Sequence, residues 1–116
     1  MTYTPREEDE QIAVVGWCDL LSVPIVHIPN EGKRSFRVGA RMKKMGLRSG
    51  FPDLFIPLSR GGYHGFFIEM KVKPNKPTAN QKEWLSRLSK EGYACTVCYG
   101  YEDAIKMIDA YLKLGN

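Results

Sequence analysis

The chain has 116 residues, of which 43% are hydrophobic and 26% are charged. These values fit one domain, residues 1–116, and argue against a long disordered chain or several domains. The net charge of +4 suits a polyanionic partner, and the lack of a long apolar run predicts no membrane span. The first residues lack the basic flank and apolar stretch of a signal peptide, so we expect a cytoplasmic protein.

Cysteine and histidine give little support for a soft-metal site. Cys18, Cys95 and Cys98 are an odd set without a secretory signal, so we expect reduced thiols rather than disulfides. Cys95 and Cys98 form a CxxC pattern inside an apolar run, but no second pair or nearby histidine completes a zinc site. His27 and His64 lack the spacing of a metal pair and are expected to be ordinary hydrogen-bonding groups.

The first two predicted elements are a helix and a strand. Residues 7–21 place apolar side chains at spacings of three and four, which predicts an amphipathic helix. Its acidic opening suits the positive end of the helix dipole. Residues 25–28 follow Pro24 and precede a turn of Pro, Asn, Glu and Gly, which predicts a short strand.

The next segment, residues 33–48, has seven Lys or Arg residues and no acidic residue. A helix would align five of these at spacings of three and four, with Gly46 placed to end it. The full candidate nucleic-acid surface is Lys33, Arg34, Arg37, Arg41, Lys44 and Arg48. We expect this basic stripe to contact phosphates, and the alternative is the solvated face of a core-packed helix.

The second half of the chain predicts a hairpin followed by helix, strand and helix. Two apolar, aromatic-rich runs, residues 51–56 and 66–72, flank a Gly-Gly turn. A helix with Thr78 as N-cap and Gln81 at the N3 position follows, then a strand over 94–99 and a helix over 102–112. The whole order predicts an α/β protein in which helices flank a small mixed β-sheet.

The hairpin carries the candidate chemistry. Glu69 and Lys71 are two residues apart on a strand, so they project from one face. A turn centred between residues 61 and 62 pairs positions whose numbers sum to about 123, which places Asp53 opposite residue 69 or 70. With a sum of 122, the three side chains converge on one patch, whereas a slip of one residue reverses the faces.

Two neighbouring carboxylates repel each other unless a cation or a proton intervenes. Oxygen ligands at this spacing suit a hard divalent ion such as Mg²⁺, which keeps waters and accepts phosphate oxygens. Lys71 could then hold the attacking water and offset charge in the transition state. The alternative for Asp53, Glu69 and Lys71 is a salt bridge at the end of the hairpin, and geometry alone leaves both open.

Pro52-Asp53 followed by Glu69-Met70-Lys71 resembles the PD-(D/E)XK nuclease signature, and the wider sequence resembles the stand-alone virus-type replication-repair nuclease (VRR-NUC) domain. The resemblance covers almost the whole chain. It includes the motifs Glu7 with Glu10-Gln11, His27-Ile28-Pro29-Asn30, Gly32-Lys33-Arg34, Gly50-Phe51-Pro52-Asp53, Gly62-Tyr63-His64-Gly65, Phe67-Ile68-Glu69-Met70-Lys71 and Gln81 with Trp84-Leu85. It implies a restriction-endonuclease-like core, dependence on Mg²⁺ or Mn²⁺, and cleavage of branched DNA such as four-way junctions by a homodimer.

The resemblance also implies roles for individual residues. Asp53, Glu69 and the Met70 carbonyl would be metal ligands, Lys71 the catalytic lysine, and Gln81 a contact to a site water or phosphate. A glutamate of the first helix would join them. Both Glu7 and Glu10 could supply it, and Glu7 is slightly favoured because it shares a helix face with Val14 and Cys18.

Three functions follow as hypotheses. The first is a structure-selective endonuclease acting on branched DNA by metal-assisted hydrolysis. The second is a DNA-binding or targeting module without turnover, whose working surface is the basic stripe. The third is a sequence-specific restriction enzyme on the same fold, which the short chain disfavours because it has no evident reading domain.

Overall fold

The computed structural model describes residues 6–29 and 36–115, and only the backbone for residues 36 and 37. The elements are α1 (Glu7–Leu20), β1 (Val26–His27), α2 (Phe36–Lys44), β2 (Leu54–Ile56), β3 (Phe66–Lys71), α3 (Ala79–Lys90), β4 (Ala94–Tyr99) and α4 (Tyr101–Leu112). Their order confirms the predicted sequence of helix, strand, helix, hairpin, helix, strand and helix. Within the described part of the chain, no helix is long and apolar enough to cross a membrane.

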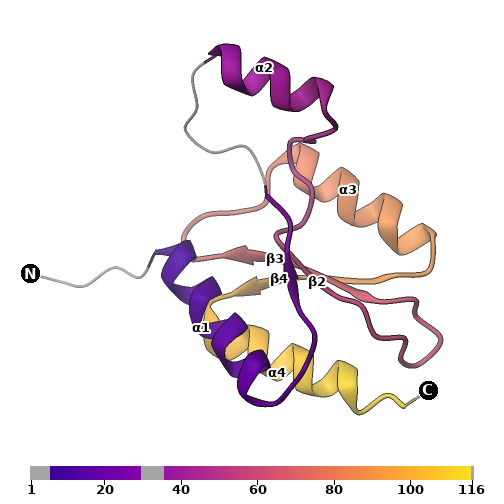
Figure 1. Cartoon of the computed structure of the whole chain (residues 1–116). Coiled ribbons are helices and arrows are strands. Elements are labelled where there is room, and N and C mark those ends of the chain that lie inside the picture. Colours follow the sequence, from indigo (N-terminus) through magenta and orange to yellow (C-terminus); the bar gives the residue numbers. More distant parts are fainter. Residues whose placement is uncertain (1–5, 30–35, 116) are drawn as a thin grey trace, which may run out of the picture.

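The four strands form one mixed sheet in the order β1-β2-β3-β4. The β1–β2 and β2–β3 pairs are antiparallel, and β3 and β4 are parallel, with α3 as the connection between them. Figure 1 shows α1 and α4 together on one side of the sheet and α3 on the other. The predicted α/β class, with helices flanking a small mixed sheet, is confirmed.

The main core lies between the sheet and the α1–α4 layer. It consists of alternate residues of the strands and the inward stripes of the two helices, since a strand presents every second side chain to one face. Its buried members are Val14, Cys18, Leu54, Ile56, Phe66, Ile68, Met70, Cys98, Ala104, Ile108 and Tyr111. Burial of this apolar surface drives folding and leaves the opposite face of β3 for other uses.

The register of the hairpin determines which residues share that opposite face. Arg60 bridges Tyr63 next to the turn, a pairing sum of 123, whereas Leu54 pairs with Ile68, a sum of 122. One extra residue is therefore accommodated in the first arm, between Ile56 and Arg60, as in a β-bulge. This one-residue change produces the register in which Asp53 and Glu69 fall on the same side of the sheet.

Three features of the helices differ from the prediction. The basic helix is shorter than expected, because α2 ends at Lys44 and Gly46 then adopts a φ of 110°. Its apolar side is not a core face, since Met45 is 79% exposed. In Figure 1, α2 stands apart from the other helices, so tertiary packing does not extend it.

The other two differences concern α3 and α4. The predicted inward residues of α3, Trp84, Leu85 and Leu88, are only half-buried, because α3 covers its side of the sheet incompletely. In α4, Tyr111 is buried, whereas the predicted inward residues Ile105 and Leu112 are half-buried. Two contacts hold Tyr111 inside: its ring stacks on Phe66 at 4.7 Å between centroids, and its hydroxyl donates to the Leu58 carbonyl at 2.6 Å.

Candidate active site

Asp53 lies immediately before β2 and is fixed at both its main chain and its side chain. Its carbonyl accepts the Ile28 N–H at 2.8 Å, and His27 Nδ1 lies 3.0 Å from the same oxygen. Its carboxylate Oδ2 accepts the Met70 N–H at 2.8 Å. Contacts from β1 and β3 thus orient one carboxylate at the end of the hairpin.

Glu69 is the second carboxylate, and it is 1% exposed on the side of β3 that faces α3. Gln81 Nε2 donates to Oε2 at 3.1 Å, whereas Oε1 is buried with no hydrogen-bond partner among the described residues. Burial raises the pKa of this carboxyl to about 9, and the nearby Asp53 carboxylate raises it further, while Lys71 opposes the shift. A buried oxygen without a partner beside another carboxylate is a position that a cation would satisfy.

Gln81 connects this carboxylate to the start of α3. The Thr78 side chain accepts the Gln81 N–H at 3.2 Å, and Gln81 Oε1 accepts the Thr78 N–H at 2.8 Å. The predicted capping box is therefore confirmed, and it uses only the oxygen end of the Gln81 amide. The nitrogen end is free to hold Glu69, so one residue both caps the helix and orients the acid.

A polar cavity of about 270 Å³ opens beside the two carboxylates. Its lining is Glu7, Ser49, Gly50, Asp53, Glu69, Thr78 and Gln81. Gly50 is required here, because it has a φ of 83° and a Cβ would lie 2.7 Å from the Asn80 carbonyl carbon. The loop before Asp53 can therefore approach the N-terminus of α3 closely.

The structure separates the two candidate glutamates of α1. Glu7 lines the cavity, and its charge contributes to the raised pKa of Glu69. Glu10 is used elsewhere, because its Oε1 accepts the Tyr101 N–H at 3.1 Å at the N-terminus of α4. The structure therefore brings Glu7, and not Glu10, to the candidate site.

Lys71 lies next to Glu69 on the same side of β3 and is 8% exposed. Among the described residues, no carboxylate oxygen lies within 4.0 Å of its ammonium nitrogen, so the expected alternative of a hairpin salt bridge is not formed. For Met70, continuing the β2–β3 register would set Pro52 opposite it. Proline has no N–H to donate to the Met70 carbonyl, which suits that oxygen to another partner.

The described residues contain no group of three or more His, Cys, Asp or Glu side chains arranged around one metal position. Asp53 and Glu69 alone would supply carboxylate oxygens, with main-chain oxygen and water completing the shell. This donor set fits Mg²⁺, which commonly binds through one or two carboxylates and keeps several waters. The cysteines are free thiols, and burial raises the pKa of Cys98 to about 12, which disfavours a thiolate ligand.

The predicted basic stripe is only partly assembled. Arg41 and Lys44 are exposed on α2, but Arg48 lies beyond its end and donates from Nη1 to the Lys43 carbonyl at 2.9 Å. A single helical stripe that includes Arg48 is therefore wrong. Lys33, Arg34 and the side chain of Arg37 lie outside the described residues.

Three parts of the site were missed by sequence reasoning. Ser49 and Thr78 line the cavity, and His27 contacts the Asp53 carbonyl. The N-cap pattern identified Thr78 for a structural reason only. Nothing local in the sequence connects residues 27 or 49 to the hairpin, because their proximity depends on the β1–β2 pairing and on the turn before Asp53.

A mixed sheet flanked by helices, with two acids and a lysine at the end of a hairpin, defines a nuclease-type α/β domain. The family model described as the VRR-NUC domain matches residues 5–102. The chain therefore belongs to the VRR-NUC family, as its motifs predict. No curated protein matches the chain.

Two solved structures are similar over nearly their full length. One, named "VRR_NUC domain protein", is 34% identical and superposes with a TM-score of 0.85, covering 99% of this chain and 94% of the other. A second, named "VRR_NUC domain", is 25% identical with a TM-score of 0.64, covering 93% of this chain and 99% of the other. Both comparisons support the fold and the nuclease-type assignment.

Proposed function

We propose that the protein is a metal-dependent, structure-selective DNA endonuclease that hydrolyses phosphodiester bonds in branched DNA. The observation that carries the proposal is the buried Glu69 carboxylate, whose Oε1 has no partner among the described residues and which lies beside Asp53 and Lys71. A purely structural site would not bury such a group, because desolvation of an unpaired carboxylate costs on the order of several kcal/mol. Family membership supports the same chemistry.

Asp53 and Glu69 would hold Mg²⁺, or Mn²⁺ in its place, with help from the Met70 carbonyl and from Glu7. The bound ion would supply positive charge that polarises the phosphodiester and stabilises charge in the transition state. The Met70 N–H keeps Asp53 turned toward this position, and Gln81 keeps Glu69 there. The chain thus orients both acids before the substrate arrives.

Lys71 would act beside the acids. Its ammonium group is buried next to Glu69 and forms no ion pair with a described carboxylate, so it is available to the substrate. It would orient the attacking water or donate a hydrogen bond to a phosphate oxygen as charge develops there. Gln81, through its Nε2, would contact the same water or phosphate only at the expense of its bond to Glu69.

DNA is the proposed substrate, held in part by the cationic side chains of α2. Arg41 and Lys44 are exposed there, where phosphates can reach them. Preference for branched DNA such as four-way junctions, and action as a homodimer with two sites, are proposed from the family resemblance. A dimer would allow one site to act on each of two strands.

The test is cleavage of labelled linear duplex, flap and four-way junction DNA in Mg²⁺, Mn²⁺ or EDTA. We expect metal-dependent cutting of the junction by the wild type, and DNA binding without cutting by Asp53→Ala. If the wild type binds these DNAs but leaves all of them intact in either metal, a DNA-binding module without turnover becomes the better interpretation. Cutting of linear duplex at one sequence would instead favour a restriction-type enzyme.

A further inference from the structure

The outer strand of the sheet, β4, presents an unprotected edge. Among the described strands it pairs only with β3, and its sequence, residues 94–99, contains neither proline nor a charged residue. Natural edge strands are usually protected by such residues, because unpaired N–H and C=O groups bind other strands. The exception at β4 therefore indicates a surface that is meant to be covered.

The hydrogen bonds show which groups of β4 face outward. The Ala94 N–H donates to the Gly65 carbonyl, and the Gly100 N–H donates to the Lys71 carbonyl, both toward β3. Because successive residues alternate in direction, the N–H and C=O groups of residues 95, 97 and 99 point away from β3. The Tyr99 N–H already donates to Asp103 Oδ2 at 2.8 Å, which leaves Cys95 and Val97 as the open positions.

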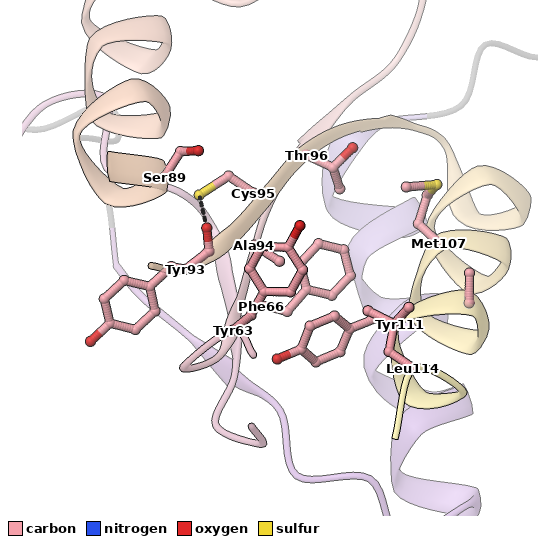
Figure 2. A pocket seen from close by; sticks show the side chains of 11 residues that line it. Tyr63, Phe66, Ser89, Tyr93, Ala94, Cys95, Thr96, Met107, Tyr111 and Leu114 are labelled. Atoms are coloured by element: carbon pink, nitrogen blue, oxygen red, sulfur yellow. Dashed lines mark hydrogen bonds between the residues drawn. The ribbon is translucent and has the colours of Figure 1, made fainter. Parts of the chain in front are cut away.

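An apolar pocket of about 310 Å³ runs along this edge between α3 and α4 (Figure 2). Three of its lining side chains are large, apolar and exposed: Tyr63 at 43%, Met107 at 38% and Leu114 at 53%. None of its eleven lining residues carries a charge, although the whole chain has a net charge of +4. Such a patch does not suit a phosphate backbone, but it can meet an identical patch without charge repulsion.

We propose that a second copy of this chain occupies the edge, with the two β4 strands antiparallel about a twofold axis at Thr96. In this register Cys95 of each copy faces Val97 of the other. Each such pair exchanges two N–H···O=C bonds, so the dimer satisfies every outward group that Tyr99 and Asp103 leave open. The same residues serve both copies, as twofold symmetry requires, and the rims of the two pockets meet on either side.

The arrangement would join two four-stranded sheets into one. A twofold axis normal to the sheet keeps equivalent faces on the same side, so both carboxylate sites would lie on one side of the joined sheet. This consequence for cleavage rests on the proposed function, whereas the interface itself does not. A single surface could then present two sites to a branched substrate.

The first test is sedimentation velocity of the full chain over a concentration series, without DNA or metal. We expect a dimer at micromolar concentration for the wild type. Thr96→Lys would set two like charges opposite each other at the axis, and Met107→Glu would place acids on the apolar rim. Each should raise the dimer dissociation constant at least about tenfold, whereas the matched control Ile12→Glu, at an exposed apolar residue of α1, should not.

The second test addresses the register. Opposed residues at a pair without backbone hydrogen bonds have Cα atoms about 4.5 Å apart, within the range of a disulfide. Thr96→Cys should therefore form a covalent dimer in oxidised glutathione, whereas Ile12→Cys should remain monomeric on a non-reducing gel. Circular dichroism of each variant establishes that the chain is folded.

Three results would overturn the proposal: a wild type that is monomeric at about 100 µM, a dimer that survives both Thr96→Lys and Met107→Glu, or folded Thr96→Cys that does not cross-link. A monomer that captures an added extended peptide at β4 would replace the second copy with a foreign strand. Asp53→Ala should dimerise normally. Failure of nuclease activity and failure of this interface are thus observed separately.

Discussion

The two faces of β3 are equally buried but are filled by different chemistry. On one face Phe66, Ile68 and Met70 pack in the core against α1 and α4, and on the other Glu69 and Lys71 lie near α3. The first face stabilises the fold by removing apolar surface from water, whereas the second costs free energy because charged groups lose hydration. The comparison teaches that burial alone does not identify a structural residue: the kind of atom buried does.

The largest expected effect is on the catalytic side of this comparison. Asp53→Asn and Lys71→Ala should each lower the cleavage rate at least about 1000-fold, because a bound ion or fixed charge supplies several kcal/mol to the transition state. Thermal unfolding should show that both variants fold. Retention of more than about a tenth of the rate in either variant would remove that residue from the proposed chemistry.

The opposite face should show the opposite result. Ile68→Ala deletes buried methyl groups of the core and should lower the free energy of unfolding by about 2–5 kcal/mol, measured by urea titration. At low temperature the folded fraction should still cut DNA at close to the wild-type rate. Loss of cleavage in a variant shown to be folded would mean that the two faces are not separable.

The pH dependence of stability tests the cost of burying Glu69. Its pKa is raised to about 9 in the metal-free fold, whereas the ordinary value is 4.5. Between these values the folded chain holds a proton that the unfolded chain has lost, so the free energy of unfolding should fall as pH rises from about 5 to about 9.

The measurement is urea unfolding at pH 5, 7 and 9 in EDTA. Glu69→Gln cannot titrate and should flatten the pH dependence, and saturating Mg²⁺ should flatten it in the wild type by stabilising the ionised acid. An equally steep slope in Glu69→Gln would show that another group is responsible.

The smallest effect is expected on α2, away from both faces of β3. Arg41→Ala and Lys44→Ala should each weaken DNA binding a few-fold and reduce the slope of log affinity against log salt by about 0.9 for each phosphate that is no longer neutralised. Lys106→Ala on α4 is the matched control, because α4 lies on the other side of the sheet. Equal effects at all three positions would mean that α2 has no special role.

Much of the fold and of the candidate site could be predicted from local patterns. The apolar periods, the capping box at Thr78 and Gln81, and the Gly-Gly turn indicated the element order, and each depends on residues close in sequence. The two possible hairpin registers reduced the site to one alternative. The observed sum of 122 places Asp53 and Glu69 together.

The remaining features depend on contacts between distant segments. The extra residue between Ile56 and Arg60 carries no sequence signal, so the register could not be chosen in advance. The choice between Glu7 and Glu10 depends on where α1 crosses the sheet and on Tyr101, 91 residues further along. The length of α2 was overestimated because a charge pattern at helical spacing does not require a helix to continue.

The most direct test of the account is the binding of Mn²⁺ to the metal-free protein, followed by the electron paramagnetic resonance signal of the free ion. The account predicts one bound ion per chain in the wild type and in Ile68→Ala, and greatly weakened binding in Asp53→Asn and Glu69→Gln. Equal binding by all four folded proteins would contradict it, since the ion would then lie somewhere other than between these two carboxylates.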